Sequence, residues 1–549
     1  MTTFATIIFY AASSPPRGTQ FSKRLVAVAG HTVWHETSTP GTMTELAAAA
    51  GTLDTADPVA VFEAFQKAYI VNDTRFKVVD FTNDKLSTAD LRPTPANDFV
   101  PTRGMILTGD GSAAQMVVDY IDAITGPTLV YGFRITDAEF INGENITGTN
   151  ENSEAVFFVL DADPVLPDPP HYYDWTPFGN DTATYGAMPD RATLATLYSG
   201  RGVLAGDREH PHQWYMSRQA NLYDWAYASL DAQSAVSGSA ADAGEIGDII
   251  TALVPYKDDY LLFGGVSTIM RLNGDPAAGG RIIEVSLTTG IYGAASWAFD
   301  DQENLYFAGA GGIFVLGPQY GSIPNSLTSE RLPDFWSDWA LDPKLHTVVM
   351  AFDKYNHGII LTRTTLLDGQ NKNYWIDVRE GGFFPETYPV SCGIYSAYNY
   401  DSTTPAFSGL ILGAQDSHLK IFDPDATDDT ASSGAVAINS HVVIGPALLA
   451  EGDDHISIMN YTSITLTSDS DGVYYDIYTH SLAERLIDNI EDGSLNPAVT
   501  KYIVPSLKTA KLRQRVSGTY YAFKLHNSRA GETWALESFT IDARASGKF

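Results

Sequence analysis

The sequence contains one cysteine, Cys392, among 549 residues. A single cysteine excludes an internal disulfide framework and any zinc or iron–sulfur site that needs several cysteines. No basic side chain stands beside Cys392 in the sequence to activate its thiol. We therefore expect Cys392 to be a small core residue.

Basic residues are also scarce, because 34 Lys and Arg stand against 66 Asp and Glu, a formal net charge of −32. A protein this acidic repels phosphate groups. The composition therefore excludes a protein whose main task is to hold nucleic acid.

Long apolar runs are missing as well, since none approaches the roughly 18 residues that a membrane-spanning helix needs. The run from Phe4 to Ala12 resembles the core of a signal peptide only weakly, because no Lys or Arg precedes it and Thr6 interrupts it. We expect a soluble protein without a cleaved leader or a membrane-spanning segment.

Turn-forming and aromatic residues are plentiful, with 46 Gly, 28 Pro, 29 Tyr and 26 Phe. Hydrophobic residues make up 44% of the chain, enough for a large core. Aromatic-rich segments interrupted by Gly and Pro are typical of short strands joined by tight turns, so the composition favours an all-β fold.

One pattern occurs seven times: a short apolar run, a turn built mostly on Gly, Asn or Asp, and a second short run. Gly and Asn tolerate the positive φ of tight reversals, so each copy predicts a β-hairpin. The copies lie at residues 25–34, 69–79, 203–216, 260–270, 305–316, 348–361 and 410–422.

The spacing of these hairpins indicates the architecture. The first apolar positions 25 and 69 are 44 residues apart, 261 and 305 are 44 apart, and 305 and 348 are 43 apart. A four-stranded propeller blade takes roughly 40 to 50 residues. We predict a β-propeller of about six to eight small blades, with several sandwiches or jelly rolls as the alternative.

A different β domain is expected within the propeller. Residues 115–120 and 129–133 alternate more strictly than the hairpins, and prolines cluster before and after them. We predict blades over 1–95, a small β-barrel or sandwich inserted between two blades over 96–165, and the remaining blades and ring closure over 166–549. Because few contacts cross the boundary of an inserted domain, its removal should leave the propeller folded.

The chain ends are expected to close the ring. Residues 518–525 and 534–541 read as two last strands, and Phe4 to Tyr10 could pair with them in one blade. Helix is expected in two short segments, 58–66 and 481–489.

Motifs for cofactors and metals are weak. The glycine pattern over 109–114 precedes an alternating strand and not the helix that a dinucleotide site needs. His210 and His212 lack a third ligand at a usual spacing. The acids over 423–429 indicate a solvated loop, with loosely held Ca²⁺ as the alternative. We predict no cofactor and no metal.

Catalytic pairs are weak too. Asp258 and Asp259, like Asp300 and Asp301, are neighbours that point to opposite faces of a strand, so neither pair can form the facing carboxylates of a glycosidase. Residues 468–474 resemble a sialidase aspartate box, but Ser470 stands where that box has Asp. We predict no catalytic residues and no enzyme activity.

A family resemblance rests on the succession of residues 200–207, Trp214 to Arg218, and Gly312 to Leu316. This succession resembles the β-propeller tail nozzle, or tail stabilisation, proteins of short-tailed bacteriophages. The resemblance implies a homohexameric ring in the virion tail, made in the host cytoplasm. It implies contacts with a portal or adaptor ring and with tail fibres or spikes, and DNA that passes through the channel without specific binding.

Two other classes remain open. A β-propeller glycan-binding protein or polysaccharide-degrading enzyme would gather acids, Arg and Tyr at the propeller axis. A ring subunit would present a flat subunit interface there instead. The second class is a nonviral scaffold for protein partners, which would lack neighbouring genes for a portal, capsid or terminase.

Basic residues gather at the C-terminal end. From Lys501 to Phe549 there are nine basic and three acidic residues, a net charge of +6, whereas the first 500 residues carry −38. We predict an interface with an acidic surface of a neighbouring subunit or tail protein, and its candidate residues are Lys508, Lys511, Arg513 and Arg515. The alternative is that these cations pair with acids of the same chain.

Overall fold

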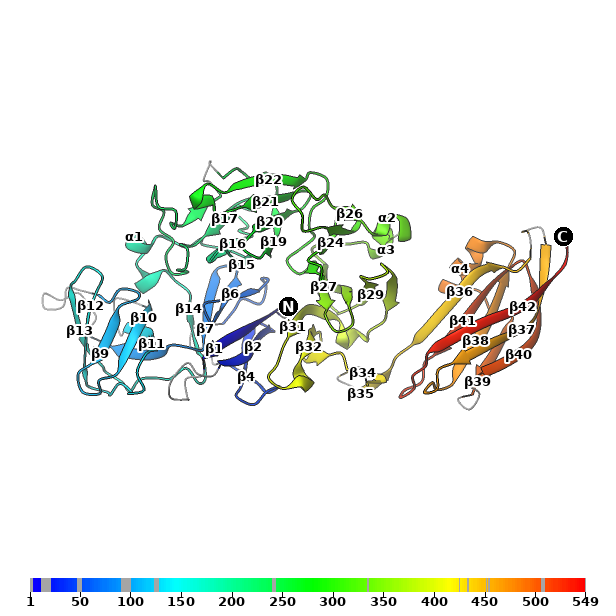
Figure 1. Cartoon of the computed structure of the whole chain (residues 1–549), viewed down its shortest axis with the longest axis horizontal. Coiled ribbons are helices and arrows are strands. Elements are labelled where there is room, and N and C mark those ends of the chain that lie inside the picture. Colours follow the sequence, from blue (N-terminus) through cyan, green and yellow to red (C-terminus); the bar gives the residue numbers. More distant parts are fainter. Residues whose placement is uncertain are drawn as a thin grey trace. The chain divides into compact units, whose positions relative to one another are not determined.

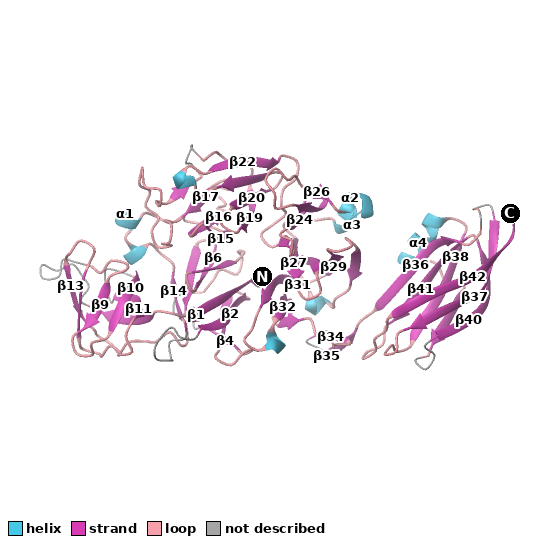
Figure 2. Cartoon of the chain, viewed as in Figure 1, coloured by secondary structure: helices cyan, strands magenta, loops and turns pink. Residues whose placement is uncertain are grey.

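A computed structural model describes residues 3–10, 21–46, 52–89, 100–122, 128–238, 243–332, 335–423, 425–431, 434–450, 452, 455–504 and 509–548. Strands make up 50% of it and helices 7%, and Figure 2 shows that the helices are short and scattered. The prediction of an all-β protein is confirmed. The chain divides into a propeller unit, residues 1–386 and 392–422, and a C-terminal unit, residues 387–391 and 423–549.

Seven antiparallel sheets in the described residues form the blades of the propeller, which surround a common axis in Figure 1. The first three blades are β1 (Thr3–Tyr10), β2 (Phe21–Ala29), β3 (Thr32–Glu36) and β4 (Met43–Glu45); β5 (Ala60–Ala64), β6 (Lys67–Asn72), β7 (Arg75–Asp80) and β14 (His171–Asp174); and β15 (Leu194–Tyr198), β16 (Arg201–Ala205), β17 (Trp214–Met216) and β18 (Val236–Ser237).

The last four blades are β19 (Ile250–Tyr256), β20 (Tyr260–Gly265), β21 (Ile269–Asn273) and β22 (Arg281–Ser286); β23 (Trp297–Phe299), β24 (Leu305–Gly309), β25 (Gly312–Leu316) and β26 (Asn325–Ser326); β27 (His346–Asp353), β28 (Gly358–Thr365), β29 (Asn371–Asp377) and β30 (Phe383–Glu386); and β31 (Ile394–Tyr400), β32 (Gly409–Ala414) and β33 (Leu419–Ile421). Each of the seven predicted hairpins falls in a different blade.

The ring closes between the first and seventh blades. Their innermost strands, β1 and β31, pack against each other, and the Thr6 amide donates to the Tyr398 hydroxyl at 3.2 Å. The apolar part of this contact contains Phe4, Leu25 and Tyr400. The predicted closure by C-terminal strands is wrong, because among the described strands β1 pairs with β2 alone, and residues beyond 422 belong to the other unit.

The additional β domain interrupts blade two and does not lie between two blades. It is one six-stranded sheet, ordered β13-β12-β9-β10-β11-β8, after which β14 returns to pair with β7. Its strands are β8 (Asp84–Thr88), β9 (Ile106–Gly109), β10 (Gln115–Ile121), β11 (Thr128–Arg134), β12 (Asn145–Thr149) and β13 (Ala155–Val159). Strand β14 has only four residues, too few for the sequence pattern to show that it belongs to this blade.

The C-terminal unit is a β-sandwich, so the predicted run of blades through 549 needs correction. Its two sheets, ordered β36-β41-β38-β39 and β40-β37-β42, enclose a core that includes Ile464, Tyr475 and Phe523. The strands are β36 (Ser440–Leu448), β37 (His455–Leu466), β38 (Val473–His480), β39 (Val499–Ile503), β40 (Thr509–Gly518), β41 (Tyr520–Asn527) and β42 (Leu536–Lys548), after a hairpin of β34 (Asp428–Ala431) and β35 (Gly434–Ala437).

The helices are α1 (Thr182–Tyr185), α2 (Thr328–Arg331), α3 (Phe335–Trp339) and α4 (Ala483–Glu491), with 3₁₀ turns η1 (Phe178–Asn180), η2 (Pro276–Ala278), η3 (Val390–Cys392) and η4 (Pro405–Phe407). Helix α4 confirms the prediction over 481–489, whereas the predicted helix over 58–66 is strand β5 and its turn. No helix of the described residues is long and apolar enough to cross a membrane.

Candidate functional site

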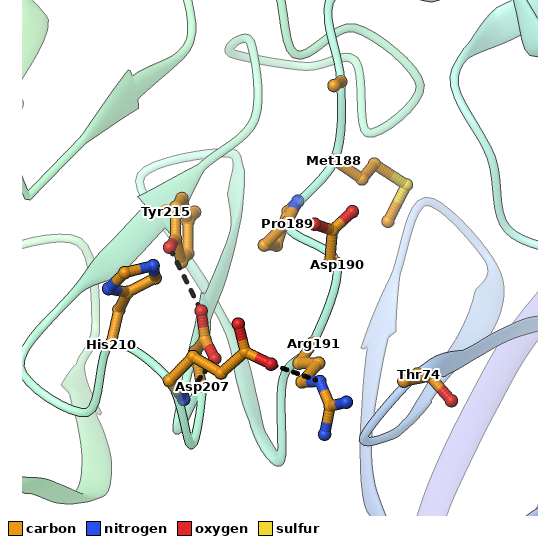
Figure 3. Close-up of a pocket in the computed structure, with 10 residues that line it drawn as sticks. Thr74, Met188, Pro189, Asp190, Arg191, Asp207, His210 and Tyr215 are labelled. Carbon is orange, nitrogen blue, oxygen red and sulfur yellow. Dashed lines mark hydrogen bonds and ion pairs between the residues drawn. The ribbon is translucent and has the colours of Figure 1, made fainter.

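A polar pocket of about 540 Å³ opens where loops of blades two and three meet. Figure 3 shows its carboxylates, guanidinium and phenol gathered around one space. Its lining residues are Thr74, Ala187, Met188, Pro189, Asp190, Arg191, Asp207, Glu209, His210 and Tyr215.

Three chain segments build this pocket. Thr74 lies in the β6–β7 turn, residues 187–191 lead from α1 into β15, and residues 207–210 form the β16–β17 loop. A backbone hydrogen bond from Ala192 N to Asp73 O, 3.0 Å long, joins the first two segments. The pocket is therefore built by loops of two neighbouring blades.

Gly206 sets the direction of the β16–β17 loop. Its φ is +78°, a left-handed conformation that glycine adopts readily, and a Cβ there would lie 2.3 Å from the Thr193 hydroxyl oxygen. That hydroxyl donates to the Gly206 carbonyl at 3.0 Å. Glycine is therefore needed for Asp207 to leave the buried strand and enter the pocket.

Most of the charges in the pocket already have partners. Arg191 lies 3.3 Å from the Asp73 carboxylate and 3.6 Å from that of Glu209. The buried Asp207 carboxylate accepts from the Glu209 amide at 2.9 Å and faces the Tyr215 hydroxyl at 3.5 Å. These contacts fix the side chains before any ligand arrives.

Tyr215 keeps its proton in this setting. Burial raises the pKa of its phenol above the usual value, and the negative charge of Asp207 raises it further. The protonated hydroxyl can therefore donate to Asp207 or to a bound polar group. Asp190 differs from its neighbours, because within the described residues its carboxylate has no hydrogen-bond or ion-pair partner.

The sequence prediction singled out only His210 in this pocket, as part of a weak metal motif. In the structure His210 stands among carboxylates, and the described part of the chain has no group of three or more potential metal ligands. Asp190, Asp207 and Tyr215 were missed, because they come from separate segments. The run of four ionisable residues that follows buried β16, residues 207–210, is the one signal that marks the site.

A second polar cluster lies between blade two and the additional sheet. The buried Lys67 ammonium lies 3.0 Å from Asp80, contacts Asp119, and donates to the Tyr173 and Tyr223 hydroxyls at 3.3 and 3.1 Å. Burial alone would lower the pKa of Lys67, but the charges of Asp119 and Asp80 hold it well above its usual value. Lys67 therefore stays charged, which suits a structural ion pair and not a nucleophile.

The predicted interface residues belong to the C-terminal sandwich, far along the sequence from the pocket and from the Lys67 cluster. Lys511, Arg513 and Arg515 are exposed on alternate positions of β40. Lys508 lies outside the described residues. The interface itself stays a prediction.

The glycine pattern over 109–114 forms a turn that holds a carboxylate of the chain itself. The amides of Gly111 and Ser112 donate to Glu144 at 3.1 and 2.9 Å. The acids proposed for loose Ca²⁺ binding also serve the fold, since Asp428 accepts from the Gly531 amide at 2.8 Å.

Comparisons with known proteins find similar folds only. No family model and no curated protein matches the chain. A 6-phosphogluconolactonase-like protein from Bacteroides uniformis has 10% identity and a TM-score of 0.33, with 79% of this chain and 96% of that one covered. AztD from Citrobacter koseri has 9% identity and a TM-score of 0.27, with 76% and 94% covered.

A streptogramin B lyase structure has 11% identity and a TM-score of 0.22, with 65% of this chain and 94% of that one covered. These similar structures are propeller-like proteins, with no phage tail or virion protein among them. The resemblance to tail nozzle proteins is therefore wrong. The residues that suggested it build two blades of a propeller: residues 200–207 and Trp214 to Arg218 lie in blade three, and Gly312 to Leu316 form β25 of blade five. Val203 and Trp214 are fully buried, and Gly200 forms a turn.

Proposed function

We propose that this chain is a β-propeller glycan-binding protein that takes a neutral sugar in the pocket between blades two and three. The observation that supports this proposal best is the gathering of Asp190, Asp207, Arg191 and Tyr215 around one opening. Sugar hydroxyls both donate and accept, so carboxylates and a guanidinium in fixed positions suit them.

The charge and the apolar surface of the pocket limit the class of sugar that it can bind. Asp190, Asp207 and Glu209 outnumber Arg191 as charged groups, so an anionic sugar would meet repulsion. Met188 and the ring of Tyr215 offer apolar surface for the carbon-bearing face of a sugar ring. A neutral glycan meets both conditions.

The partners of the three pocket carboxylates favour a protein that binds a glycan over one that cleaves it. A glycosidase needs two carboxylates on either side of the scissile bond. Glu209 is paired with Arg191, and Asp207 is held by the Glu209 amide. Asp190 alone has no partner in the described residues.

Calorimetric titration with neutral, amino and uronic oligosaccharides tests the proposal. The wild type should bind a neutral glycan, and Asp190→Asn should weaken that binding about tenfold or more, because one charge-assisted hydrogen bond is lost. Asp259→Asn, at an exposed position of the same unit, is the matched control. Release of reducing sugar by the wild type, abolished in Asp190→Asn, would instead identify an enzyme.

A further inference from the structure

The outer face of the β40–β37–β42 sheet is basic. Its residues, here called the basic face, are Lys511, Arg513 and Arg515 of β40, Tyr461 of β37 and Arg544 of β42. The strand register places Tyr461 beside Arg513, and the Lys511 ammonium lies 3.7 Å from the centre of the Tyr461 ring. The alternate residues of β40 face the other way: Ala510, Leu512 and Val516 pack in the core, and Gln514 is buried.

The cations of the basic face are left without acidic partners. None of the four forms an ion pair with a carboxylate in the part of the chain that the structure describes. Asp542 is the one acid that the register brings opposite Tyr461. In a chain with 66 acids and 34 bases, four unpaired cations on one face are available to an external anion.

The spacing of these cations suits an extended ligand. Alternate residues of a strand are about 6.8 Å apart, so the three side chains of β40 form a row about 14 Å long. Hydroxyls of Ser463, Ser517 and Thr540 occupy the same side of the sheet by register. The row therefore offers charges, hydroxyls and one aromatic ring along a single line.

We propose that the basic face binds an anionic polysaccharide, a polymer with carboxylates or sulfates on its sugars. Cations pair with the acidic groups, while Tyr461 and the hydroxyls contact the sugar rings. Double-stranded DNA, with one charge per about 1.7 Å, has a higher charge density than a polymer with one carboxylate per sugar, so a chain of net charge −32 repels DNA more strongly than such a polymer.

Binding to polygalacturonate and to heparin at low salt tests this proposal, with dextran as the neutral comparison. The wild type should bind at least one of the two polyanions. The triple variant Lys511→Gln, Arg513→Gln, Arg515→Gln should bind about 10- to 100-fold more weakly, because three charge contacts are lost. Binding by the wild type should also weaken as the Debye length shortens from about 10 Å at 0.1 M salt to 3 Å at 1 M.

A charge-matched control separates the face from the net charge. Arg281→Gln, Lys344→Gln and Arg485→Gln together remove three exposed cations elsewhere and should leave polyanion binding unchanged. Circular dichroism and thermal melting check that each variant folds. If the triple variant does not fold, the double variant Arg513→Gln, Arg515→Gln replaces it.

Four results would overturn the assignment: no binding of either polyanion by the wild type, equal binding by the triple variant, equal loss in the control, or equally tight binding of a DNA duplex. Self-association that only the triple variant loses, without polyanion binding, would identify a second copy as the occupant. The proposal does not rest on the pocket, because Asp190→Asn should leave polyanion binding intact.

Discussion

The Lys67 ammonium of blade two contacts the Asp119 carboxylate of the additional sheet. Strands β6 and β10, which carry them, are separated by 52 positions at this contact and belong to different sheets. Arg103 adds a second cation to Asp119 at 3.0 Å, and Asn83 donates to both Asp80 and Asp119. A network of polar side chains that are partners of one another thus joins the two sheets.

Replacing Lys67 should strongly destabilise the folded protein. Lys67→Met would leave the carboxylates of Asp80 and Asp119 together without their shared cation, and breaking such a buried pair costs about 3–5 kcal/mol. The free energy of unfolding, measured by urea denaturation, should fall by that amount. Lys344→Met, at an exposed position, should change it by less than about 0.5 kcal/mol. A small effect of Lys67→Met would show that the network adds little stability.

The same network predicts acid sensitivity. Burial would raise the pKa values of Asp80 and Asp119, but the charge of Lys67 lowers both below their usual value, with Arg103 assisting at Asp119. Their contribution to stability should be complete above the unfolded pKa of about 3.9 and should disappear as the pH falls toward the lower folded values.

Urea midpoints between pH 6 and pH 2 measure this contribution. Asp119→Asn should be less stable than the wild type at pH 6 and should lose less stability on acidification. Asp259→Asn, at an exposed site, should follow the wild-type curve. Parallel curves for the wild type and Asp119→Asn would contradict the prediction.

Removal of the additional sheet should unfold the propeller unit, contrary to the expectation from sequence. Tyr120 of β10 stacks on Tyr173 and Tyr223 of the propeller with ring centres 5.1 and 4.5 Å apart, within one shared apolar core. A short turn could join β7 to β14, since Asp80 and His171 are register partners. The shortened chain should nevertheless aggregate or melt without cooperativity, and a sharp thermal transition would refute this.

Removal of the C-terminal unit should be tolerated. The contacts that close the ring come from residues before 423, as between Thr6 and Tyr398. A chain ending at Phe422 should therefore keep a β-type circular dichroism spectrum and a cooperative melt. Tyr400→Phe in that chain should lower its stability by about 1–3 kcal/mol, because the buried Glu36 loses a donor.

A comparison of two glycine substitutions tests whether the loop that carries Asp207 requires glycine at position 206. Gly206→Ala adds a left-handed alanine and a clash with Thr193, so it should cost about 2–4 kcal/mol. Gly143 has a similar φ of +80° but open space around its Cβ position, so Gly143→Ala should cost only about 1–2 kcal/mol. Equal costs in urea denaturation would show that the clash is relieved.

The fold was predictable where a turn residue marks each blade. Gly30 and His31 both have positive φ in the β2–β3 turn, and Asp73 does so between β6 and β7. These local signals predicted the hairpins and hence the propeller. Strands of two residues, such as β18 and β26, carry no pattern. Sandwich strands alternate as blade strands do, so the C-terminal unit could not be told from further blades.

The pocket was not predictable for a different reason. Its residues lie in three segments, and only the contact of blade two with blade three brings Thr74, Asp190 and Asp207 together. The cluster around Lys67 could not be predicted either, because the sequence around an isolated lysine in a strand does not indicate that Asp80 and Asp119 will surround it. The predicted basic residues were found by charge counting, which needs no knowledge of the fold.

The closure between β1 and β31 has a consequence for how the chain folds. The Thr6–Tyr398 hydrogen bond joins residues 392 positions apart, whereas each blade is made largely of neighbouring hairpins. Contacts of such long separation form slowly, since the loop between them must first be ordered. During synthesis the apolar face formed by Phe4 and Leu25 therefore stays uncovered until the seventh blade has emerged, and an uncovered apolar face of this kind is prone to aggregation.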